Sequence, residues 1–344
     1  MNRRTCLKTL AAAGLLGPSK LLASVTNAIP GAESVENLPK IKGTITLYLG
    51  RGEGGLYEDI LEAIEKRNPD LKLKIRRGPS SALANTIVAE SGAGLKRADV
   101  FWAIDSGSIG RVVHDANAEP LPSNIRTLLK PEFQRESWAP ISGRIRTLPY
   151  NTNRVTPEDL PKSILDLPDS GLKIGWAPAY AAFQSFVTAL LLTEGEKTTR
   201  DWLRAMRSKA RSFAGELNVV MAVASGDLDI GLANHYYSLR LKKGRPDAPL
   251  ALGFTHNDAG CLLNASGVVL MKSRPETHLF LRYLLTKEVQ SYLSREAYEI
   301  PLVAGLEPPK GLPPISEIKP PKVDLDKLAN MKPTLALLRD TGIL

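Results

Sequence analysis

Apolar and polar residues follow two alternating periods in the first part of the chain, and this alternation favours an α/β fold. Residues 44–116 contain short apolar runs typical of strands, each followed by a segment with the 3.6-residue period of a helix. In order, the segments are TITLYLG, LYEDILEAIEKRNP, LKLKIRR, SALANTIVAESGAG, ADVFWA and SGSIGRVVHDA. This order is typical of βαβ units around a mostly parallel sheet.

The first of these helices carries apolar side chains on one face. Leu56 is followed four, seven and eight positions later by Ile60, Ala63 and Ile64. Such spacing places the side chains on a single stripe of a helix. We therefore predict that this stripe packs against the sheet.

A second series of strand and helix patterns begins near Arg146. It contains RTLPYN, SILDL, LKIGWAP, the helix patterns FQSFVTALLLTEG and TTRDWLRAMRS, then VVMAVASG and LDIGLAN. After Pro249, strand-like LALGF and GVVLMK precede two helix patterns around LFLRYLLTK and EVQSYLSREA. Proline-rich residues from Leu306 to Lys322 predict an extended strap over the surface. Two such series in 344 residues predict a two-lobed α/β protein.

The N-terminus has the composition of a cleavable export signal. Arg3 and Arg4 precede a short apolar run and then small residues, which resembles a twin-arginine signal over residues 1–28. Export of this kind predicts a periplasmic location. Cleavage would remove Cys6 and leave Cys261, which cannot form an intramolecular disulfide alone.

Net charge gives little support for a nucleic-acid partner. The chain carries +9, and loss of the four basic residues in 1–28 would leave +5. The remaining Lys and Arg are scattered rather than massed beside aromatic residues, so nucleic-acid binding is not expected. Capture of an anion or an anionic complex stays open.

Motifs for hydrolytic or redox chemistry are missing, so we do not expect an enzyme. The sequence contains no HExxH, CxxC, GxSxG, P-loop or GxGxxG after a strand. The four histidines are spread along the chain without an i, i+4 pair. Gly50 to Gly55, GRGEGG, follow a predicted strand and precede a helix, where backbone N–H groups could bind an anion. A plain tight turn explains these glycines equally well.

Two adjacent tyrosines, Tyr236 and Tyr237, lie where the strand-like GLAN turns into the helix-like HYYSLR. Adjacent side chains on a regular helix diverge by about 100°, so both phenols reach one ion only at such a junction. A free phenol loses its proton near pH ~10. A trivalent metal ion displaces that proton, as bound cations do with other ligands. The pair would therefore suit a hard, highly charged cation; the alternative is one core residue and one surface residue, as is usual for neighbouring aromatics at the start of a helix.

The segment DLDIGLANHYYSLRL resembles the tyrosine-pair region of the periplasmic ferric-ion-binding proteins of ABC transporters. Six further segments resemble that family in the same order along the chain: TLYLGRGEG, ADVFWAID, SGRIRTLPYNT, IGWAPAYAAFQ, NDAGCLLNASGVVLMKS and YEIPLVAGLEPPKGLPP. The resemblance implies a two-lobed type II periplasmic-binding-protein fold, with a ligand cleft between lobes joined by two crossing strands. The crossings are expected near Ser142–Thr147 and Leu262–Val269.

The same resemblance implies a ligand and its binding residues. Tyr236 and Tyr237 would bind Fe(III), and Asn234 would lie near carbonate or another synergistic anion. Ala181 and Ala182 open a helix whose free N–H groups could hold that anion. The implied partners are an ABC permease and its ATPase, and we expect a monomer.

The opening turn and the segment after ADVF depart from some members of the family. Gly52 stands where those members have a histidine ligand, and Ile104 followed by Asp105 stands where they have a glutamate ligand. Other members carry arginine in the opening turn, and Arg51 fits their role of holding carbonate against the metal. Glu53 and Asp105 are weaker candidates for a hard-cation site, since both residue types are often solvated or cap helices.

Tyr180 is either a third phenol ligand or an aromatic wall of the cleft. We expect residues 43–145 with about 246–285 to form the first lobe, and 146–245 with about 286–344, including the strap, to form the second. Two alternatives stay open: the same fold binding an oxyanion or small organic anion without metal, and an exported enzyme that acquires a cofactor before export.

Overall fold

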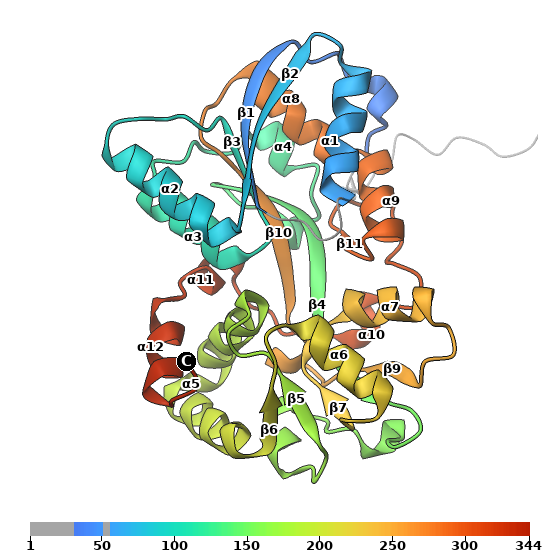
Figure 1. Ribbon diagram of the computed structural model, residues 1–344. Helices are drawn as coiled ribbons and strands as arrows, with labels where there is room; N and C mark the ends of the chain where they lie inside the picture. The colour runs from blue at the N-terminus through green and yellow to red at the C-terminus, as the bar shows by residue number, and fades with distance from the viewer. Residues whose placement is uncertain (1–30, 51–55) are drawn as a thin grey trace, which may run out of the picture.

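Two long antiparallel strands join the halves of the molecule. The computed structural model describes residues 31–50 and 56–344. β4 (Ala139–Asn151) and β10 (Leu263–Leu270) lie side by side and run between the upper and lower lobes in Figure 1. Every residue of β4 is buried, as expected for a strand covered on both faces. The structure thus has crossing strands in the two regions that the resemblance implied.

The first lobe is built on the predicted βαβ units. β1 is parallel to both β2 and β3, and the sheet continues through β10 to β4. Its elements are β1 (Gly43–Gly50), α1 (Leu56–Arg67), β2 (Leu71–Gly78), α2 (Ser80–Gly92), β3 (Val100–Ala103), α3 (Ser106–Asp115), α4 (Ser123–Arg126), α8 (Pro275–Leu284), α9 (Lys287–Glu296) and β11 (Ile300–Pro301).

The second lobe extends the sheet from β4 through β7 and β5 to β6. Its elements are β5 (Ile174–Trp176), α5 (Ala181–Lys209), β6 (Ala210–Ser212), α6 (Glu216–Ser225), β7 (Ile230–Gly231), β8 (Ala233–Asn234), α7 (His235–Gly244), β9 (Leu250–Gly253), α10 (Ile315–Ile318) and α12 (Lys332–Asp340). Gly195, at φ 80°, interrupts α5, and this break separates the two helix patterns seen in the sequence. Among the described residues, no helix is long and apolar enough to cross a membrane.

The lobe boundaries differ from those expected at two places. β9 pairs with β4 at residues 148–151, where β4 also pairs with β7, so the chain near residue 250 belongs with the second lobe. α9 packs against α1, so the chain near residue 290 belongs with the first lobe. Sequence patterns identify these two elements, but the lobe to which each belongs is decided by strand pairing for β9 and by helix packing for α9.

The buried face of α1 is rotated relative to the predicted stripe. Its buried side chains are Tyr57, Ile60, Leu61 and Ile64, whereas Ala63 is exposed. Tyr57 is drawn inward because its ring stacks on Trp102, with centroids 4.4 Å apart. An aromatic side chain buries more apolar surface than alanine does, which accounts for the shift.

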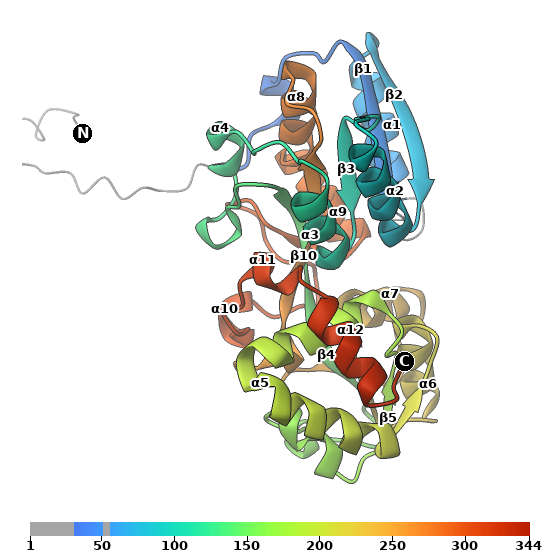
Figure 2. The same ribbon diagram turned by 90° about the vertical axis from the view of Figure 1, so that its left-hand side faces the viewer.

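The C-terminal segment contacts both lobes. Within the predicted strap, Leu306–Lys322, the short α10 is the helical part. After it, α11 (Leu325–Leu328) packs on α3 of the first lobe, and α12 packs on α5 of the second (Figure 2). Trp138 Nε1 donates a 2.7 Å hydrogen bond to Asp326 at this bridge.

We expect Gly110→Ala to lower the free energy of unfolding by about 1–3 kcal/mol, because overpacking a tight contact has this cost. A Cβ at Gly110 would overlap the Cβ of Ala329 and lie 3.1 Å from its Cα. Urea unfolding measures the change. Gly92→Ala is the matched control, since a Cβ at this helical position meets nothing within 4 Å. Equal stability changes in the two variants would contradict the predicted contact.

Candidate functional site

The tyrosine pair occupies the first turn of α7. β8 pairs with β4 at Arg146 and Thr147, and α7 begins immediately after β8. The strand-to-helix junction expected for the pair is therefore present. Tyr236 and Tyr237 are 3% and 6% exposed, and their ring centroids lie 4.5 Å apart.

A third phenol reaches this pair from another element. Tyr180 is the N-cap residue of α5, and its hydroxyl lies 2.9 Å from the hydroxyl of Tyr237. Asn234 Nδ2 donates a 3.4 Å hydrogen bond to the Tyr236 hydroxyl. Ala181 and Ala182 begin the first turn of α5, where backbone N–H groups have no acceptor within the helix. The structure thus brings six of the predicted site residues together at the starts of α5 and α7.

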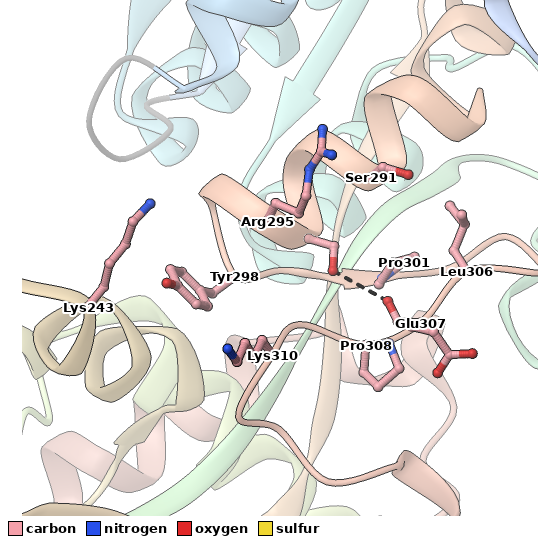
Figure 3. Close-up of a pocket in the computed structure, with 10 residues that line it drawn as sticks. Lys243, Ser291, Arg295, Tyr298, Pro301, Leu306, Glu307, Pro308 and Lys310 are labelled. Atoms are coloured by element: carbon pink, nitrogen blue, oxygen red, sulfur yellow. Dashed lines mark hydrogen bonds between the residues drawn. The ribbon is translucent and has the colours of Figure 1, made fainter. Parts of the chain in front are cut away.

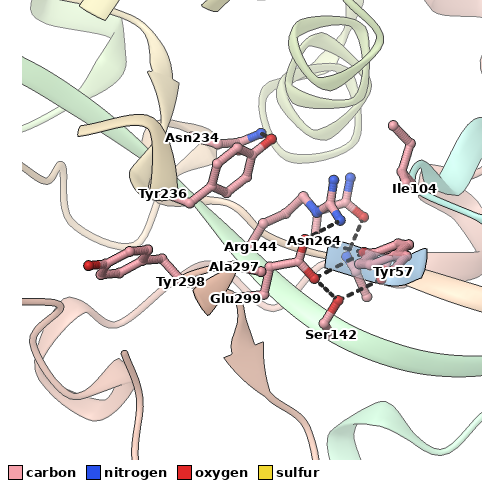
Figure 4. Close-up of polar contacts among 12 residues, drawn as sticks. Tyr57, Ile104, Ser142, Arg144, Asn234, Tyr236, Asn264, Ala297, Tyr298 and Glu299 are labelled. Carbon is pink, nitrogen blue, oxygen red and sulfur yellow. Dashed lines mark hydrogen bonds and ion pairs between the residues drawn. The ribbon is translucent and has the colours of Figure 1, made fainter. Parts of the chain in front are cut away.

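Arg144, on β4, was not singled out from the sequence. Its guanidinium lies 5.9 Å from the ring centroid of Tyr236 and 3.6 Å from a carboxylate oxygen of Glu299 (Figure 4). The residue is 6% exposed, and its Nε and Nη2 have no hydrogen-bond partner within the described chain. Burial acts to lower the pKa of Arg144, but Glu299 and neighbouring phenols outweigh it and raise the pKa. A permanent positive charge with unused donors therefore lies beside the phenols.

Glu299 anchors Arg144 to both crossing strands. Its carboxylate accepts hydrogen bonds from Tyr57 at 3.1 Å and from Ser142, and Ser142 lies 2.6 Å from Ser266. Burial raises the pKa of Tyr57, with the Glu299 charge as the next cause, so this phenol remains protonated and donates. The network joins α1, β4, β10 and the turn before β11, as Figure 4 shows in part.

A buried ion pair positions the beginning of α7. Arg146 and Glu216 form a 2.5 Å contact, with side chains 2% and 0% exposed. The second carboxylate oxygen of Glu216 accepts the Asn234 backbone N–H at 2.9 Å. The Arg146 guanidinium also lies over Phe183 and Phe186, at 5.6 and 5.2 Å from their ring centroids.

His235 connects the start of α7 with the turn that follows α9. Its Nδ1 accepts the Ile145 N–H at 3.2 Å, and its Nε2 lies 2.6 Å from the Tyr298 carbonyl oxygen. These partners assign the proton to Nε2, because a carbonyl can only accept. Burial lowers the pKa of His235 to about 3, so the ring is neutral at physiological pH.

Of the remaining predicted residues, Arg51 and Glu53, with Gly52 between them, fall outside the described residues, as does the proposed export signal. Asp105 caps α3, accepting from the Ser108 N–H at 2.8 Å and its hydroxyl at 2.9 Å. Within residues 31–50 and 56–344 there is no cluster of three His, Cys, Asp or Glu side chains that could hold a metal.

Comparisons with known proteins agree on the family. The family described as bacterial extracellular solute-binding protein matches residues 50–291. The chain is 30% identical to the Fe(3+)-binding periplasmic protein of Serratia marcescens, over 96% of this chain and 98% of that protein. Iron-bound HitA from Pseudomonas aeruginosa is 28% identical, with a TM-score of 0.79 over 88% of this chain and 100% of its own.

A further solved structure is Trichodesmium FutA, in complex with iron and citrate ligands. It is 27% identical, with a TM-score of 0.73 over 87% of this chain and 99% of its own. Together with the crossing strands and the two lobes, these similarities confirm the fold class expected from the sequence. The chain belongs to the bacterial extracellular solute-binding proteins and shares the two-lobed fold of the periplasmic ferric-ion-binding proteins.

Proposed function

We propose that this protein captures ferric iron through Tyr236 and Tyr237, with Tyr180 as a third phenol ligand. The observation that carries this proposal is the 2.9 Å contact between the Tyr180 and Tyr237 hydroxyls, beside the Tyr236 ring. Three phenols, two buried and one half-buried, suit a hard cation, because burial disfavours free phenolates without a compensating charge. Ferric iron supplies that charge and displaces the three phenol protons.

A synergistic anion, carbonate or another small oxyanion, completes the proposed site. Three phenolates already balance the charge of Fe(III), so an added anion needs a cation of its own. Arg144 is suited to this role because it is buried, charged and has unused N–H donors. The first-turn N–H groups of Ala181 and Ala182 and the side chain of Asn234 are further donors. Arg51 stays a predicted anion ligand.

Capture and delivery would then follow from movement of the lobes. We propose that the lobes close about β4 and β10 when the metal and its anion bridge them. In this role the protein is the substrate-binding component of an ABC importer, exported to the periplasm as a monomer. It delivers iron to a membrane permease coupled to an ATPase and performs no catalysis itself.

Metal analysis and absorption spectra test the proposal. Protein purified from iron-free medium should be colourless and should gain one equivalent of iron and a visible phenolate-to-iron charge-transfer band when ferric citrate and bicarbonate are added. Omitting bicarbonate should weaken the band.

The alternative, an oxyanion or small organic anion bound without metal, is favoured by the unused donors of Arg144. It predicts protein that stays colourless with ferric citrate but gains thermal stability from phosphate or a carboxylate. That result would overturn the iron assignment.

A further inference from the structure

A cavity lies away from the tyrosine pair, between α7, α9 and the strap. Its volume is about 550 Å³, which is within the range of small-molecule sites. Figure 3 shows Lys243 of α7 at one side, Arg295 of α9 above and Lys310 of the strap below. Residues from both lobes thus line one cavity.

The cavity has an excess of positive charge. Lys243, Arg295 and Lys310 line it, and Glu307 is the acidic residue among its lining side chains. Lys243 is paired with Glu296 at 3.2 Å, but neither Arg295 nor Lys310 makes an ion pair within the described chain. In Figure 3 the Glu307 carboxylate points away from the ammonium groups of Lys243 and Lys310. Arg295 and Lys310, both exposed, thus line the cavity without an ion-pair partner in the described chain.

The shape of the cavity is held by backbone contacts. Ser294 Oγ lies 3.4 Å from the Glu307 carbonyl oxygen, which ties α9 to the strap. Tyr298 has a left-handed backbone at φ 55°, and His235 holds its carbonyl at 2.6 Å. The Tyr298 ring lies between Lys243 and Lys310 in Figure 3. The backbone on two sides of the cavity is thus held in place by hydrogen bonds.

The apolar part of the lining selects among anions. Pro301, Leu306 and Pro308 contribute hydrocarbon surface, while Ser291 and Tyr298 add hydroxyl groups. A bare oxyanion would leave the hydrocarbon surface uncovered, whereas a carbon skeleton with separated carboxylates would contact both it and the two cations. We propose that this cavity is a second binding site, specific for small organic polycarboxylates.

Such an occupant would also join the lobes. Lys243 lies on the helix that begins with the tyrosine pair, and Arg295 lies on α9 of the first lobe. Arg240 already donates to the Ala297 carbonyl at 2.8 Å across the same junction. A polycarboxylate between α7 and α9 adds a bridge that favours the present lobe arrangement.

Calorimetric titration of the metal-free full chain with tricarballylate tests the site without involving iron. We expect Arg295→Gln with Lys310→Gln to weaken binding by about a hundredfold, at about tenfold for each charge-assisted contact removed. Lys72→Gln with Lys74→Gln on exposed positions of β2 removes the same charge and should leave the affinity unchanged. Inorganic phosphate should bind at least about tenfold more weakly than tricarballylate.

Arg144→Gln separates this site from the tyrosine site. Tricarballylate affinity should be unchanged in that variant. The proposal is overturned if the unaltered chain does not bind tricarballylate. It is also overturned if Arg144→Gln abolishes tricarballylate binding while the variant Arg295→Gln with Lys310→Gln binds normally. A loss of affinity in the β2 control as large as in that variant would overturn it too. Phosphate binding as tightly as tricarballylate would contradict the assigned ligand class. Iron binding is measured separately, from the visible band, so failure of the iron proposal is distinguishable from failure of this one.

Discussion

Replacing Tyr236 and Tyr237 together by phenylalanine is expected to remove the visible charge-transfer band and to weaken ferric iron binding by more than about a hundredfold. Changes to groups that merely support metal ligands cost about 10–100-fold, so loss of two direct ligands should exceed that range. The rings remain, and they pack in a buried cluster at 3% and 6% exposure, so the fold should persist. Titration with ferric citrate in bicarbonate, followed by absorption, measures both effects.

One further single variant and one control variant at a distant tyrosine show whether the loss is specific to the proposed ligands. Tyr180→Phe should leave a weaker band at a shifted wavelength, because two phenolates remain on the metal. Tyr48→Phe is the control, since the Tyr48 hydroxyl donates to Glu90 at 2.8 Å on β1, in the other lobe. Retention of the full band in the double variant would refute the ligand assignment. An equal loss in Tyr48→Phe would indicate general damage instead.

Local sequence identified the parts of the site that depend on neighbouring residues. The junction of β8 and α7 is visible in GLANHYYSLR, because an apolar strand pattern gives way there to a polar helix pattern. The local helix pattern began at Phe183, and the family resemblance placed the start at Ala181, where α5 begins. Chain order alone did not reveal that Tyr180 and Tyr237, 57 positions apart, have hydroxyls 2.9 Å apart.

The network around Arg144 could not have been predicted from local patterns. Tyr57, Ser142 and Glu299 come from distant parts of the chain, and they meet because α1 and the turn before β11 both pack at the crossing strands. The available signal was two arginines at alternate positions in the strand-like ISGRIRTLPY, which contains no other charged residue. Burial makes such charges costly unless they are paired, so each implied a hidden partner.

The second of those arginines gives the largest expected effect on stability. Arg146→Met should lower the free energy of unfolding by about 3–5 kcal/mol, because it leaves the Glu216 carboxylate buried without its cation. Methionine retains the contact with Phe183 and Phe186, which lie under the guanidinium at 5.6 and 5.2 Å. Urea unfolding followed by tryptophan fluorescence measures the loss.

Adding Glu216→Gln to Arg146→Met should recover more than half of that loss. Glutamine removes the unpaired charge while its carbonyl oxygen still accepts the Asn234 N–H, the bond that sets where α7 begins. The exposed pair Lys197–Asp201 is the control, and Lys197→Met should leave the unfolding curve unchanged. A double variant no more stable than Arg146→Met would mean that arginine acts through packing alone. If the double variant regains stability and also shows the iron band, the two charges are needed only to neutralise each other. The function of the ion pair would then be to orient α7, the helix that carries the tyrosine pair.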